Sequence, residues 1–265
     1  MSAPAPSSTP LHYRRHGPVG AAPLVLLHSL GGNGSQWDAV ADALGRRGFA
    51  TLALDLRGHG RSPTVPGDDA IPAHADAVAE TLGLLGGPPP ALVAGVSFGG
   101  LVALSLALRH PRLAPRLALI ATDARIGTPE TWRERIALVE SQGLPVVAPA
   151  IIRRWFSPSF AAAHPSALTG AATALAAGSP VGYLAACRAL ASTDLSEQLP
   201  QIAVPALVVA GGADPVVPPD SMRRLASALP AATYVELPGL GHLPPLEAPA
   251  QVASLLSGFA PPPAS

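Results

Sequence analysis

The stretch that decides the fold is VAGVSFGGLVAL, residues 93–104, in which apolar residues lead up to one serine surrounded by glycines. An apolar run followed by Gly-x-Ser-x-Gly and by a segment rich in alanine and leucine predicts a strand that turns sharply into a helix. Glycine is needed there because the end of the strand and the start of the helix almost touch. Such a turn presents the hydroxyl of Ser97 outward, as a candidate nucleophile. The alternative interpretation is a glycine-rich turn in which Ser97 only caps the helix.

The rest of the chain repeats this alternation of short apolar runs and helical patterns. The runs are apolar at nearly every position, which is typical of parallel strands covered by helices on both faces. The predicted strands are 22–30, 49–56, 91–97, 116–123, 206–214 and 233–239, and the predicted helices are 35–48, 74–86, 98–109, 221–230 and 249–259. We therefore expect an α/β fold with a mostly parallel central sheet and helices on both faces.

The alternation stops in the middle of the chain. Residues 124–203 are alanine-rich and helical in pattern throughout, which predicts a helical lid inserted into the core. The core then consists of 11–123 and 204–260. Residues 1–10 and 261–265 are rich in proline, alanine and serine and are predicted to be loose tails.

The composition limits the possible chemistry and partners. Hydrophobic residues make up 48% of the 265 residues and charged residues 13%, as expected of one large globular unit. Seventeen basic and seventeen acidic residues leave no formal net charge, so we expect neither a nucleic-acid nor a membrane partner. All the basic residues are arginines. The absence of lysine excludes Schiff-base chemistry, pyridoxal attachment and a phosphate-loop lysine.

The cysteine and histidine content argues against a metal site. Cys187 is the only cysteine, which excludes an internal disulfide and a cysteine-based zinc cluster. His12, His16, His74 and His110 show no metal-ligand spacing, so we expect no metal site. The N-terminus lacks an apolar signal core, which predicts a cytoplasmic location. The sequence leaves the oligomeric state open.

A serine nucleophile needs an imidazole that accepts its proton and a carboxylate that orients the imidazole. His242 is the candidate base, because it lies on a glycine-flanked loop between the last predicted strand and the last predicted helix. Two carboxylates could serve as its partner: Asp214 and Asp123 each come at the end of a predicted strand. We favour Asp214, with Asp123 as the alternative.

Two backbone amides are also needed to hold the negative oxygen of a tetrahedral intermediate. One comes from the residue after the nucleophile, Phe98. Leu30, in the glycine-rich loop after the strand 22–30, is the expected second donor. We expect His28 to hold that loop by hydrogen bonding.

Three motifs resemble those of the α/β-hydrolase superfamily: GVSFGG at 95–100, DLRGHGRS at 55–62 and GHLPPLEAP at 241–249. From the lid onward the chain is similar to the 3-oxoadipate enol-lactonases, through the segments 124–136, 153–160, 178–190 and 194–214. The resemblance implies Ser97 as nucleophile, His242 as base and Asp214 as its partner. It also implies hydrolysis of the enol-lactone of 3-oxoadipate, in the bacterial degradation of aromatic acids, without a cofactor.

A small-molecule substrate with a free carboxylate calls for a cation in the lid, and here the cation must be arginine. Trp132 and Arg135 are spaced i,i+3 and are the expected substrate-binding pair. The alternative is that Trp132 packs the lid on the core and Arg135 faces solvent, in which case Arg125, Arg153 or Arg154 supplies the cation. Other functions with the same residues are a general carboxylesterase, a cofactor-free perhydrolase, a carbon–carbon bond hydrolase or a non-catalytic ligand-binding protein.

Overall fold

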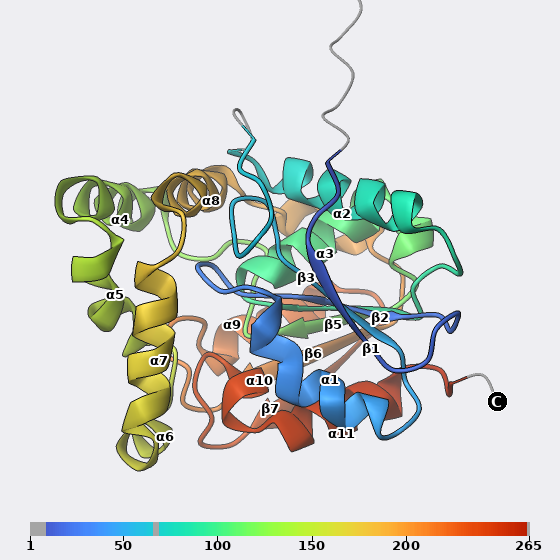
Figure 1. The fold of residues 1–265 in the computed structure, drawn as a ribbon. Helices are drawn as coiled ribbons and strands as arrows, with labels where there is room; N and C mark the ends of the chain where they lie inside the picture. Colours follow the sequence, from blue (N-terminus) through green and yellow to red (C-terminus); the bar gives the residue numbers. More distant parts are fainter. Residues whose placement is uncertain (1–8, 66–68, 264–265) are drawn as a thin grey trace, which may run out of the picture.

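A seven-stranded sheet forms the centre of the fold in the computed structural model, which describes residues 9–65 and 69–263 (Figure 1). The strands are β1 (Tyr13–His16), β2 (Leu24–Leu27), β3 (Thr51–Leu54), β4 (Leu92–Val96), β5 (Leu117–Ile120), β6 (Ala206–Gly211) and β7 (Ala232–Leu237). Their order in the sheet is β1-β3-β2-β4-β5-β6-β7, and every pair except β1 with β3 is parallel. The predicted fold class is confirmed.

Helices cover both faces of this sheet. The helices are α1 (Asp38–Gly45), α2 (Ile71–Leu85), α3 (Phe98–Arg109), α4 (Pro129–Gln142), α5 (Leu144–Ile152), α6 (Pro158–Ala163), α7 (Pro165–Ala176), α8 (Pro180–Ser192), α9 (Pro219–Ala228), α10 (Pro244–Glu247) and α11 (Pro249–Phe259), with short 3-10 turns at Gly34–Trp37, Pro111–Leu113 and Ser196–Gln201. Figure 1 shows α2 and α3 on one face of the sheet and α1 and α11 on the other. Alternate residues of the inner strands enter two separate cores, as in β2: Val25 and Leu27 pack toward α2 and α3, while Leu24 and Leu26 pack toward α1 and α11.

The first strand is an element that the sequence pattern did not indicate. β1 has the sequence YRRH, without an apolar run, and three of its four residues are exposed. It pairs antiparallel with β3 at the edge of the sheet, where it needs to bury neither face. Charged residues are typical of such edge strands because they discourage further pairing.

The predicted strand ranges extend beyond the carboxyl ends of the observed strands, and the extra residues include the candidate site residues Ser97 and Asp214. The strands stop at Leu27, Val96, Ile120, Gly211 and Leu237, and the residues that follow form loops. Because the strands β2 to β7 are parallel, all these loops emerge from the same edge of the sheet.

The predicted lid corresponds to a run of helices between β5 and β6. The helices α4 to α8 lie together beside the core in Figure 1. The division into core and lid at 124–203 stays a prediction, and the predicted tails lie largely outside the described residues. Within the described residues, no single helix is long and apolar enough to cross a membrane; α7 and α8 pass such a test only as a pair bent by 96°.

Candidate active site

Ser97 occupies the strained turn that the sequence predicts between β4 and α3. Its φ of 54° and ψ of −117° lie in a region that residues with a side chain rarely adopt. The turn is closely packed: a Cβ on Gly95 would collide with the backbone of Gly99, and one on Gly99 would collide with Leu27. The main-chain oxygen of Ser97 accepts a hydrogen bond of 2.7 Å from the Thr122 hydroxyl. The backbone around Ser97 is therefore held in a conformation that local preference opposes.

His242 and Asp214 form a buried pair on the loops after β7 and β6. The Nδ1 atom of His242 lies 2.8 Å from Oδ2 of Asp214, and both side chains are almost completely buried. The other oxygen of Asp214, Oδ1, accepts hydrogen bonds from the backbone amides of Val216 and Val217, at 2.7 and 3.0 Å. These amides fix the carboxylate, so that Oδ2 is left for the imidazole. With Nδ1 engaged, Nε2 is the nitrogen of His242 that remains for chemistry.

Asp123, the alternative acid, forms a hydrogen bond with the residue that directly follows it. Its Oδ1 accepts a hydrogen bond of 2.8 Å from the next amide, that of Ala124. Burial raises the pKa of Asp123 above the ordinary value. Among the described residues, Asp214 is the carboxylate that contacts His242.

The loop after β2 is held by His28, as the sequence predicts. The Nε2 atom of His28 accepts a hydrogen bond of 2.8 Å from the amide of Leu56, and Nδ1 donates to the carbonyl of Ser29 at 2.7 Å. Both ring nitrogens are engaged in a way that requires the neutral imidazole. Burial lowers the pKa of His28 to about 3, which preserves this state. The loop thus brings Leu30 to the same cavity as Ser97.

Phe98, the other predicted amide donor, is the first residue of α3. The amide of a first helical residue has no acceptor within its own helix, so it is available for an oxygen atom near Ser97. The Phe98 ring is fully buried and packs between His59 and His74, at centroid distances of 5.9 and 4.9 Å.

His74 is buried without hydrogen bonds. Neither of its ring nitrogens has a partner among the described residues. Burial, and next the proximity of His59, Arg57 and His28, lowers the pKa of His74 to about 3. Below pH 6.5 the unfolded chain therefore binds a proton that the folded chain refuses, so stability falls as the pH falls.

We expect His74→Leu to remove this penalty. From pH 6.5 down to pH 5 the histidine costs the wild type about 2 kcal/mol of unfolding free energy, at about 1.4 kcal/mol per pH unit. The leucine variant lacks this cost, and it also lacks two unsatisfied nitrogens in the core. Urea unfolding of both proteins at pH 7 and pH 5 measures the difference. Equal losses of stability in the two proteins would show that His74 does not cause the acid sensitivity.

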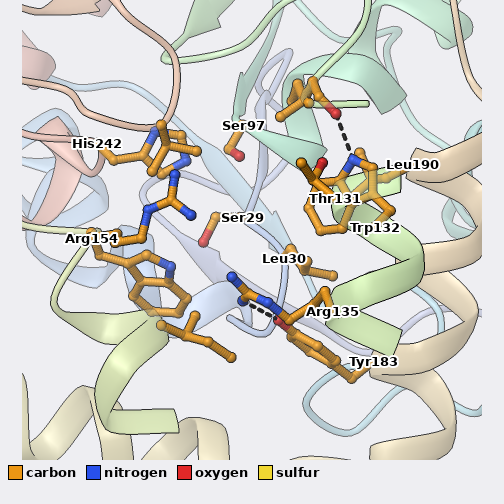
Figure 2. A pocket seen from close by; sticks show the side chains of 15 residues that line it. Ser29, Leu30, Ser97, Thr131, Trp132, Arg135, Arg154, Tyr183, Leu190 and His242 are labelled. Carbon is orange, nitrogen blue, oxygen red and sulfur yellow. Dashed lines mark hydrogen bonds between the residues drawn. The ribbon is translucent and has the colours of Figure 1, made fainter. Parts of the chain in front are cut away.

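Ser97 and His242 line one cavity of about 200 Å³ (Figure 2). Its apolar lining includes Leu30, Ile126, Ile151, Leu190 and Val216. Its polar and aromatic lining consists of Ser29, Ser97, Thr131, Trp132, Arg135, Arg154, Trp155, Tyr183 and His242. No acidic side chain is among the described residues that line it. The cavity therefore combines the Ser97 hydroxyl, an imidazole and two guanidinium groups in a space suited to a small molecule.

The two predicted substrate-binding residues, Trp132 and Arg135, both line this cavity from α4. The indole of Trp132 donates a hydrogen bond of 2.6 Å to the carbonyl of Ile126, and Arg135 donates one of 3.3 Å to the hydroxyl of Tyr183. Tyr183 is almost completely buried, and its ring packs against Gly31, next to Leu30. Arg135 therefore lines the cavity while its guanidinium is bonded to Tyr183.

Comparison with known proteins identifies the family of the chain. The model of the alpha/beta hydrolase family matches residues 24–255. The chain belongs to this family.

Relatives of the hydrolase include enzymes with two kinds of ester substrate. It is 34% identical to 3-oxoadipate enol-lactonase 2 of Acinetobacter baylyi, over 78% of this chain and 76% of the relative. It is 35% identical to the pimeloyl-(acyl-carrier protein) methyl ester esterase of Chromobacterium violaceum, over 83% of this chain and 87% of the relative. The crystal structure of the enol-lactonase from Burkholderia xenovorans superposes with a TM-score of 0.89 at 34% identity, covering 94% of this chain and 95% of that one.

Arg154, one of the three alternative cations that the sequence offers, also lines the cavity of the hydrolase. The other two alternative arginines lie outside this cavity. Arg125 is 3.7 Å from the carboxylate of Asp194, and Arg153 lines a separate groove between α5 and α7. The sequence pattern does not distinguish Tyr183 as a site residue. Its helix α8 reads as an ordinary alanine-rich helix, so periodicity alone offered no signal for it.

Proposed function

We propose that this hydrolase opens a small lactone that carries a free carboxylate, and that its substrate is 3-oxoadipate enol-lactone. The observation that supports this most directly is that Ser97, His242 and Arg135 line the same small cavity, with no acidic side chain among the described residues around it. A guanidinium is suited to bind the carboxylate of such a substrate while its ring reaches the hydroxyl. The likeness to enol-lactonases, in sequence and in structure, supports the same substrate.

In the proposed first step, the hydroxyl oxygen of Ser97 attacks the lactone carbonyl while Nε2 of His242 accepts the hydroxyl proton. Asp214 keeps the proton of the neutral imidazole on Nδ1 and stabilises the imidazolium. The amides of Leu30 and Phe98 donate to the oxygen that becomes negative. The ring C–O bond then breaks. The leaving oxygen takes the proton from His242 as an enol, which becomes the ketone.

In the second step, water attacks the acyl group on Ser97 while His242 accepts a proton from it. The C–O bond to Ser97 breaks, His242 returns the proton to the serine oxygen, and the acid loses its remaining proton to solvent and leaves as a carboxylate. Each group performs the same role in reverse, so the cycle needs no further group from the protein.

The second candidate function is hydrolysis of an uncharged ester. The apolar part of the cavity lining favours it, and a methyl ester esterase is among the relatives. The two functions are separated by kcat/KM for the enol-lactone and for a 4-nitrophenyl ester of a short acid. A large preference for the lactone supports the lactonase, and a preference for the neutral ester supports the esterase.

Replacing Arg135 by leucine tests the proposed carboxylate contact. We expect kcat/KM for the anionic lactone to fall about ten- to hundred-fold, since a charge-assisted hydrogen bond contributes roughly 1.5–3 kcal/mol. The neutral ester should be nearly unaffected. Tyr183→Phe removes only the hydroxyl that positions Arg135 and should cause a smaller loss in the same direction. Equal losses on both substrates would mean that Arg135 has a structural role.

A further inference from the structure

A second arginine, Arg154, enters the cavity from a different side than Arg135. Figure 2 shows Arg154 on the side of His242, whereas Arg135 lies beside Tyr183 and Leu30. Arg154 has no carboxylate partner among the described residues, while Arg135 is held by the Tyr183 hydroxyl. The cavity thus has one guanidinium on the side of the imidazole and another on the side of Tyr183.

The backbone next to Arg154 is bonded to the loop of His242. The amide of Leu243 donates a hydrogen bond of 3.0 Å to the carbonyl of Trp155. Leu243 directly follows His242, and Trp155 directly follows Arg154. The imidazole and the guanidinium therefore belong to adjoining backbone segments, although 88 positions separate Arg154 from His242 in the numbering (242 − 154).

A carboxylate strengthens this connection. One oxygen of Glu247, Oε1, accepts hydrogen bonds from the amides of Ser157 and Gly241, both at 2.9 Å, and Oε2 accepts one of 2.6 Å from the Ser157 hydroxyl. The two segments are so close that a Cβ on Gly241 would collide with the backbone at Ser157. The side chain of Arg154 is exposed, but the main chain that directly follows it is bonded to the loop of the candidate base.

The proposed reaction creates an anion on this side of the cavity. Resting on that function, the substrate brings one carboxylate, which Arg135 binds. Hydrolysis of the acyl group on Ser97 adds the oxygen of water to the acyl carbon and releases a second carboxylate, whose proton goes to solvent. This new carboxylate forms between Ser97 and His242, where Arg154 is the remaining cation of the cavity.

We infer that Arg154 is a second anion-binding residue, which receives the carboxylate produced at Ser97, so that the cavity is a site for short dicarboxylates. The two arginines then serve different ends of one product. Ligands of the same length that carry only one carboxylate occupy one arginine and leave the other without a partner.

Calorimetric titration with adipate and with its monoamide, adipamate, tests this inference without relying on catalysis. The two ligands have nearly the same size and differ by one negative charge. We expect the wild type to bind adipate about three- to ten-fold more tightly at constant ionic strength, a modest factor because Arg154 is partly in water. Equal affinities, or no binding of adipate, would overturn the inference.

The neighbouring arginine provides a matched control. Arg154→Gln should abolish the preference for adipate, and Arg154→Lys should restore part of it. Arg153→Gln removes the same charge one residue away, in a different groove, and should leave the preference unchanged. If Arg154→Gln kept the preference, or if Arg153→Gln lost it equally, a local site at Arg154 would be wrong.

Failure of the proposed function and failure of the inference about Arg154 give different results. An enzyme that does not hydrolyse the enol-lactone but prefers adipate through Arg154 has the dicarboxylate site and another substrate. An enzyme that hydrolyses the lactone but binds both ligands equally has the proposed function without the second anion-binding residue.

Discussion

Ser97→Ala is expected to abolish hydrolysis while the protein stays folded. Loss of the nucleophile from a serine–histidine–carboxylate arrangement lowers turnover by about a million-fold. The substitution removes one buried oxygen and keeps the backbone as it is, so the thermal transition should change little. Turnover of the enol-lactone and of a nitrophenyl ester provides the measurement. Substantial remaining activity in the folded variant would assign the nucleophile to another residue.

Ser97→Gly serves as the companion of that experiment. It is equally inactive in the proposed mechanism, but glycine adopts a positive φ without steric cost. We expect Ser97→Gly to be more stable than Ser97→Ala by about 1 kcal/mol, the order of the strain stored at such positions. If both variants are inactive and Ser97→Gly is the more stable of the two, the chemical role of the Ser97 side chain is separated from the strain in its backbone.

Asp214→Asn is expected to reduce turnover by about ten-thousand-fold, as the corresponding change does in serine proteases. The amides of Val216 and Val217 would hold the carbonyl oxygen of the new asparagine and direct its NH₂ group at His242. Nδ1 must then accept a hydrogen bond, which places the proton on Nε2. An imidazole in that tautomer cannot accept the proton of Ser97.

Asp123→Asn is the matched control for the acid. The side chain bonds to the adjacent amide of Ala124 and has no contact with His242 among the described residues. We expect a loss of less than about ten-fold, within the range of small rearrangements near a site. The opposite ranking of the two variants would place the functional carboxylate after β5 instead of β6.

The positions of these residues could be predicted because parallel strands release their loops at one edge of the sheet. Continuously apolar runs identified the strands, and Ser97, Asp214 and His242 follow three of them. The choice between Asp123 and Asp214 could not be made in this way, since both follow neighbouring strands. The turn at Val216 and Val217 orients the carboxylate, and such a turn is visible only in three dimensions.

The lid residues were harder to predict for a different reason. Arg153 and Arg154 are adjacent in the sequence, yet only Arg154 lines the cavity, because the chain turns just after α5 ends. β1 was missed because an exposed edge strand needs no apolar pattern. Side chains whose direction depends on a bend, and strands that bury no face, lack a periodic signal.

The hydrogen bonds between the segments at 155–157 and 241–247 also bear on how the protein moves. The amides of Ser157, Gly241 and Leu243 each donate across this junction or to the carboxylate within it. Local opening must break these bonds together, so the three amides should exchange with deuterium at a common rate. The same bonds hold His242, because the residues on both sides of it, Gly241 and Leu243, donate within this junction.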